Sequence, residues 1–162
     1  MNLPFAKVFV VLALSAAAAA IGSASGHSQS ADDGVIRVKS AYGVEETVKI
    51  LERDIAAKGI KFFSEIDQAK LAAEAGIQLR PSILLTFGNP PLGIQFLTAD
   101  PYAGLDWPVR MLVLQDAAGQ VWIAYSDFAY IARRHHIENR TDQFLMASQV
   151  AASVAASAQS KQ

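Results

Sequence analysis

An almost unbroken apolar run in the middle of the chain constrains the fold more than any other feature. Residues 82–87 read SILLTF, with Pro81 before them and the turn-forming residues Gly88-Asn89-Pro90-Pro91 after them. A short apolar run bounded by strand-breaking residues predicts a central strand that is covered on both faces. We therefore expect Leu84 and Leu85 to be almost fully buried.

The rest of the chain alternates between strand and helix patterns. Val44, Val48, Leu51 and Ile55 recur at helical spacing, and Gly59 follows as a typical helix end. Short runs of β-branched or apolar residues between turn residues predict strands. By these patterns we expect strands at residues 35–38, 60–66, 109–114 and 121–125, a hairpin turn at 116–119, and helices at 44–58, 68–75, 92–99, 128–135 and from 139 or 141 to 150.

This order predicts an α+β fold, because one hairpin occurs among strands that are otherwise joined by helices. We expect a single two-layer domain, in which helices pack on a mixed, mainly antiparallel sheet. Its expected limits are residues 34–137. A C-terminal helix at 138–156 and a disordered tail at 157–162 are expected to follow.

Composition excludes several classes of function. The chain of 162 residues has a formal net charge of −1, which gives no case for a general nucleic-acid binder. It contains no cysteine, so disulfides, thiolate metal sites and cysteine nucleophiles are all excluded. Stability must come from packing or from association with another chain.

Residues 1–25 have the pattern of a bacterial signal peptide. Lys7 precedes the uncharged run 8–21, and the small residues GSASG follow. The run is shorter than the roughly 20 residues that a membrane-spanning helix needs, although an uncleaved anchor is the alternative. Cleavage between Ala24 and His27 predicts a periplasmic or secreted protein that does not stay on the membrane. Residues 26–33 are expected to form a flexible leader.

Several blocks carry a family likeness. VEETVKILERDIAAKGIKFFSEID, then LRPSILLTFGNPPLG, then the loop at 106–108, then MLVLQDAAGQVWIAYSD resemble the successive blocks of the domain-of-unknown-function family 302 (DUF302). The likeness spans residues 34–136. It implies a compact α/β domain that forms a homodimer and has no established activity.

The sequence also departs from the family pattern at two positions. Gln68 stands where the family usually has histidine, and Pro91 stands where lysine is common. A role that needs an imidazole or an ammonium group at these positions is therefore not expected of this chain.

Polar residues at strand ends and in loops are the candidates for a site. Asp67, Asn89, Asp106 and Tyr125 are such residues, and Trp107 lies in a Pro/Gly-rich loop where it could line a pocket. We expect any pocket to lie beside the turn that contains Asn89. The alternative is architectural: Asn89 forms a turn before proline, Asp106 bonds loop amides, and Asp127 caps a helix in the same way.

The histidines point to metal only at the N-terminus. His135 and His136 are adjacent rather than four apart, so they favour a basic helix end over a metal pair. Cleavage after Ala24 would place His27 third in the mature chain, where an amine, two amides and an imidazole can bind Cu(II). The alternative is that His27 is an ordinary leader residue.

These observations favour a non-enzymatic periplasmic module, dimeric and without a cofactor, that binds a small ligand or a partner protein. One alternative is an enzyme that uses Asp67, Asp106 and Tyr125 without a tightly bound cofactor. Another is a copper-handling protein that uses His27. Carboxylates gathered in one pocket would favour the enzyme, whereas an apolar cavity without acids would favour binding.

Overall fold

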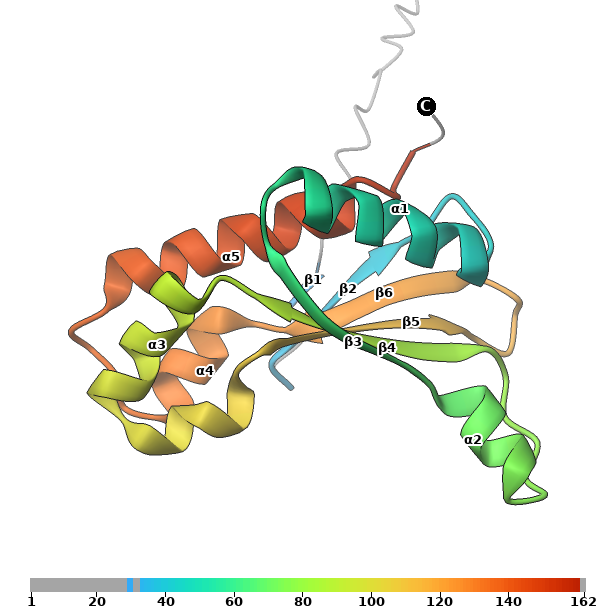
Figure 1. The fold of residues 1–162 in the computed structure, drawn as a ribbon, viewed down its shortest axis with the longest axis horizontal. Coiled ribbons are helices and arrows are strands. Elements are labelled where there is room, and N and C mark those ends of the chain that lie inside the picture. The colour runs from blue at the N-terminus through green and yellow to red at the C-terminus, as the bar shows by residue number, and fades with distance from the viewer. Residues whose placement is uncertain (1–28, 31–32, 161–162) are drawn as a thin grey trace, which may run out of the picture.

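The computed structural model describes residues 29–30 and 33–160 (Figure 1). The predicted signal peptide and His27 lie outside these residues. The elements, in chain order, are β1 (Gln29–Ser30), β2 (Val35–Lys39), α1 (Val44–Ala57), β3 (Lys61–Asp67), α2 (Gln68–Glu74), β4 (Ser82–Gly88), α3 (Pro90–Ala99), the 3-10 helix η1 (Pro101–Asp106), β5 (Val109–Gln115), β6 (Val121–Ser126), α4 (Phe128–Arg134) and α5 (Thr141–Ala156).

The strands form one sheet in the order β1-β2-β6-β5-β4-β3, and every pair of neighbours is antiparallel. α1 and α5 lie on the same face of this sheet, α3, η1 and α4 gather at one end, and α2 projects from the other end (Figure 1). The α+β class and the two-layer arrangement are confirmed. No helix in the described ranges is both long and apolar enough to cross a membrane.

The core lies between the sheet and the pair α1 and α5. The helical spacing in α1 places Val48, Leu51 and Ile55 on its buried face, as predicted. Every second residue of β4, β5 and β6 packs against this buried face of α1, because successive strand residues point to opposite faces of the sheet. The fully buried members of this sheet face are Leu85, Phe87, Met111, Val113 and Ile123.

Among the residues that the structure describes, no helix covers the opposite sheet face (Figure 1). Leu84 lies on it, and pairs with Leu112 of β5 and Ile66 of β3. Leu84 and Leu112 are half-buried, and Ile66 is 38% exposed. The prediction for Leu85 is confirmed, since it exposes 0% of its surface, but the prediction for Leu84 is wrong. An unbroken apolar run shows that both faces of a strand are apolar, and not that both are covered.

The C-terminal segment packs more firmly than expected. Ala158 is fully buried, and its carbonyl accepts hydrogen bonds from the amide of Ala41 at 2.9 Å and the hydroxyl of Ser40 at 3.2 Å. Residues 157–160 are therefore part of the domain and not a loose tail. At the other end, residues 29–30 of the expected leader pair with β2 as a short strand.

Candidate functional site

A cavity of about 390 Å³ lies between the end of β4, the start of α3, and α5. It is beside the turn at 87–90, where the sequence predicts a pocket. Carbon-rich side chains make up most of its wall. They belong to Ile60, Phe87, Leu92, Phe96, Trp107, Val109, Phe128, Met146, Ala147, Val150 and Ala151.

Two glycines allow Trp107 to form one wall of this cavity. A Cβ atom at Gly93 would overlap Trp107 Nε1, and one at Gly88 would lie 3.2 Å from the same atom. Only glycine at position 93 lets the indole lie flat against α3. The Phe63 ring contacts the indole edge-on from β3, with the ring centroids 5.9 Å apart. The position of Trp107 is therefore fixed from two sides.

Aromatic stacking joins the helices behind the cavity. The rings of Phe96 in α3 and Phe144 in α5 are stacked with centroids 4.2 Å apart, and Phe128 of α4 lies 6.4 Å from Phe96. These contacts hold three helices around one apolar space. α5 supplies a whole side of the cavity, which the sequence did not predict.

Few of the described residues bring a polar side chain to the cavity, and none of these brings a carboxylate. They are Lys58, Asn89, Gln149 and Ser153. Lys58 is paired with Asp54 one turn back on α1. Asn89 begins α3 with extended backbone (φ −105°, ψ 103°), as expected before proline, but its side chain does not cap the helix. Its carboxamide is exposed at the cavity.

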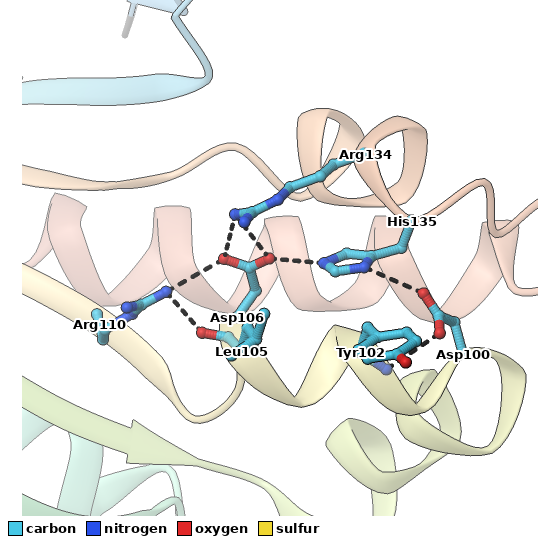
Figure 2. A network of polar contacts seen from close by, with 7 residues as sticks. All are labelled: Asp100, Tyr102, Leu105, Asp106, Arg110, Arg134 and His135. Atoms are coloured by element: carbon cyan, nitrogen blue, oxygen red, sulfur yellow. Dashed lines mark hydrogen bonds and ion pairs between the residues drawn. The ribbon is translucent and has the colours of Figure 1, made fainter.

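A second cluster of polar groups lies close by, around Asp106 at the end of η1 (Figure 2). The side chains of Asp106 and His135 are only 5% and 6% exposed. His135 Nε2 lies 2.7 Å from Asp106 Oδ2, and His135 Nδ1 lies 3.1 Å from Asp100 Oδ2. Asp106 also accepts from Arg110 at 3.1 Å and Arg134 at 3.2 Å. We call these five residues the Asp106 cluster.

Hydrogen bonds and ion pairs in the Asp106 cluster link η1 to the end of α4. His135, the C-cap of α4, contacts Asp100 at the start of η1 through Nδ1 and Asp106 at its end through Nε2. The guanidinium groups of Arg110 and Arg134 also pair with Asp106. Within the described ranges, no group of three or more histidine, aspartate or glutamate side chains is placed to hold a metal ion. Both carboxylate oxygens of Asp106 thus accept hydrogen bonds from side chains of the protein, which stabilises the fold.

The family model described as "Domain of unknown function DUF302" matches residues 36–158. The chain belongs to the DUF302 family. In structure it is similar to the crystal structure of an uncharacterised conserved DUF302 protein from Bacillus stearothermophilus, with a TM-score of 0.71 and 17% identity over 77% of this chain and 98% of that one.

Among curated proteins, this DUF302 chain is 34% identical over 111 residues to "Fluoride-specific ion channel FluC 1" of Brucella suis, a match that covers 68% of this chain and 44% of the relative. It is also 34% identical over 111 residues to "Fluoride-specific ion channel FluC 2" of Brucella melitensis, and this match covers 41% of that relative. The chain thus spans less than half the length of these relatives.

Only some of the site residues predicted from the sequence lie together in the structure of this DUF302 protein. Asn89 and Trp107 both line the cavity. Asp106 is next to Trp107 in the chain but its carboxylate is committed to His135 and two arginines. Asp67 pairs with Ile83 at the start of β4, about 20 Å along the strand from Asn89. There it caps α2, accepting from the amide of Lys70.

Tyr125 is also away from the cavity. It is 3% exposed, on the covered sheet face between Met111 and Ile36. Asp127, two residues later, caps α4 by accepting from the amide of Ala129, as the architectural alternative held. His27 lies outside the described residues, so copper binding there stays a prediction.

The burial of Tyr125 predicts a loss of stability in alkali. Burial, and secondarily the charge of Asp127, raise its pKa from 10.0 to about 12. The unfolded chain releases this proton first, so the stabilisation is complete below pH 10 and disappears as the pH rises to about 12. In urea unfolding across this range, Tyr125→Phe should lose less stability than the wild type. Tyr102→Phe, at a 75% exposed position, should behave as the wild type, and an equal slope in all three proteins would contradict the prediction.

Proposed function

We propose that this DUF302 protein is an exported, non-enzymatic module that holds a small apolar ligand in the cavity beside Asn89 and Trp107. The observation that carries the proposal is a cavity of about 390 Å³ lined by apolar side chains and by no carboxylate. Small-molecule sites in proteins have this size and this mostly apolar lining, with a few polar groups that orient the ligand.

The position of the acidic residues supports binding over catalysis. An acid/base centre needs its groups within hydrogen-bond reach of one substrate. Asp67 lies at the far end of β4, Tyr125 is in the core, and Asp106 is held by His135. These three residues therefore do not form one centre.

Filling the cavity tests the proposal. Val150 lines the cavity from α5, so Val150→Phe should occupy the space a ligand needs. With 1-decanol as the probe and tryptophan fluorescence in the Trp122→Phe background as the readout, so that Trp107 is the remaining tryptophan, we expect affinity to fall at least about tenfold, the equivalent of 1.4 kcal/mol. The matched control is Leu145→Phe, at a 57% exposed position on the same helix that does not line the cavity. Equal affinity in both variants, or no response from the wild type, would refute the proposal.

Export is the second part of the proposal and rests on residues 1–25. Fractionation of the host cell should place the chain in the periplasm or the medium, with its N-terminus between Ser25 and Ser28. A full-length chain in the membrane fraction would refute export without affecting the ligand proposal.

We also propose that a second copy covers the open sheet face. Ile66, Leu84, Leu112 and Ala124 form a row across four neighbouring strands there, and a two-fold pair is the commonest arrangement of soluble oligomers. Leu112→Glu, in the middle of the row, should convert a dimer to a monomer in sedimentation at tens of micromolar. Lys49→Glu on α1, on the opposite side, should leave the dimer intact. A monomeric wild type would rule this dimer out.

A second candidate function comes from the curated relatives. We propose as the alternative that the domain works beside a fluoride channel, since the matched 111 residues make up less than half of proteins named as such channels. Deleting the gene should then make the host more sensitive to fluoride. Unchanged growth over a full range of fluoride concentrations would contradict this alternative and leave the ligand proposal standing.

A further inference from the structure

The lining of the cavity separates into a buried part and an exposed rim. Phe87, Gly93 and Phe96 are buried and apolar. The exposed lining residues are Lys58, Met146 and three neutral polar residues: Asn89, the N-cap of α3, and Gln149 and Ser153 of α5. The last three lie at the solvent side of the cavity. We call these three residues the rim. A molecule in the cavity would place its apolar body inside and one end at the rim.

The rim offers hydrogen bonds that the protein does not use. In the part of the chain that the structure describes, the side chains of Asn89, Gln149 and Ser153 bond no other protein group. Two carboxamides and a hydroxyl can both donate and accept. A single polar group at the end of a ligand would therefore find partners whichever role it takes.

The charges around the cavity disfavour an ionised ligand. No carboxylate lines it, so a cation has no partner. Lys58 is the one charged lining residue in the described ranges, and it is paired with Asp54. An anion at Lys58 would meet both this carboxylate and the carbonyl end of α1, whose C-cap is Lys58. Moving an unpaired charge out of water is costly, whereas a neutral polar end is matched by the rim.

We propose that the ligand is an uncharged amphiphile, with a hydrocarbon body and one alcohol, amide or ester group that hydrogen-bonds to the rim. This inference rests on the proposed ligand-binding function of the cavity. Apolar contact in the buried part supplies affinity, and the rim selects neutral over ionised ends. Asn89 and Gln149 are the residues that determine this selectivity.

A set of probes with equal chains and different ends tests the proposal. The full mature chain, with Trp122→Phe so that Trp107 is the remaining tryptophan, is titrated at pH 7 with 1-decanol, decanoate and decylammonium. We expect 1-decanol to bind at least about tenfold more tightly than either ion. Each CH₂ removed from the alcohol should weaken binding about fourfold.

The outcomes separate the two claims. Binding of decanoate or decylammonium as tight as that of 1-decanol would overturn the inference and leave the cavity as a ligand site. No response to any of the three would overturn the proposed function, and the inference with it. Calorimetry on the unmodified chain should give the same order of affinities, which excludes an effect of Trp122→Phe.

Variants of the rim give an independent test. Asn89→Ala with Gln149→Ala should weaken 1-decanol about fivefold, the equivalent of one neutral hydrogen bond, and should reduce the preference over decanoate. The matched control is Gln143→Ala, on α5 but away from the lining. Since Asn89 and Gln149 are exposed and unbonded, folding should be unaffected, and unfolding curves verify this. A rim variant that binds 1-decanol as the wild type does would overturn the inference.

Discussion

Replacing Leu85 with alanine should lower the free energy of unfolding by about 4 kcal/mol, because the side chain is fully buried and the space left behind cannot close. Leu85 lies on the covered face of β4, where its register partner Met111 is also fully buried. Both are part of the core that α1 and α5 cover. Urea unfolding at low micromolar concentration, followed by circular dichroism, measures the change.

Leu84 is the matched control for this substitution. It is the next residue of the same strand and the same type, but it points to the open face and is only half-buried. Leu84→Ala should therefore cost less than about 2 kcal/mol in the monomer. Equal losses at the two positions would show that the second face is covered as well. If the loss at Leu84 then disappeared on dilution, the cover would be a second copy of the chain.

The fold could be predicted to the extent that local patterns determine it. The spacing of Val48, Leu51 and Ile55 places α1, and the turn residues after β4 end that strand where they were expected to. The position of β4 beside the edge strand β3 was not predictable in this way. It depends on which distant segments pair with it, and an apolar run looks the same at either place in the sheet.

The candidate site was predictable on one side only. Asn89 and Trp107 were found because a turn after a buried strand and an aromatic residue in a loop are local signals. The α5 side of the cavity was missed, because Ala147, Val150 and Ala151 form part of an alanine-rich segment with little helical pattern. Only docking of α5 against α3, seen in the stack of Phe96 on Phe144, makes them lining residues.

The surroundings of His135 were not predicted, for a related reason. Two adjacent histidines after two arginines predict a basic helix end, and Arg133 and Arg134 do lie in the last turn of α4 with His135 as its C-cap. The side chain of His135 is only 6% exposed, since the acidic partners Asp100 and Asp106 come from a segment about 30 residues earlier. The available signal was the pair of aspartates in a loop rich in proline and glycine. Their partners cannot be read from spacing.

Asp106→Asn should lower the free energy of unfolding by about 3 kcal/mol, because it removes the acceptor charge from the centre of the Asp106 cluster. The side chain is 5% exposed, and its partners Arg110 and Arg134 are about half exposed, so solvent compensates part of the loss. The contact to His135 is the unscreened one, at 2.7 Å between two buried groups. Asp106→Asn leaves His135 with Asp100 alone and takes the carboxylate partner from Arg110 and Arg134, and breaking a buried pair from one side costs several kcal/mol. Asp33→Asn, in an exposed pair with Arg37, is the control and should leave unfolding unchanged.

The same substitution should weaken binding in the cavity, because Trp107 follows Asp106 directly and forms one cavity wall. The Asp106 cluster holds the end of η1, and Gly93 gives the indole no room to move toward α3. A small shift of η1 must therefore displace Trp107 from this wall. We expect Asp106→Asn to weaken 1-decanol binding about threefold, the equivalent of about 0.7 kcal/mol, under conditions in which the variant is folded. Unchanged affinity together with the full loss of stability would show that the cluster stabilises the domain without positioning Trp107.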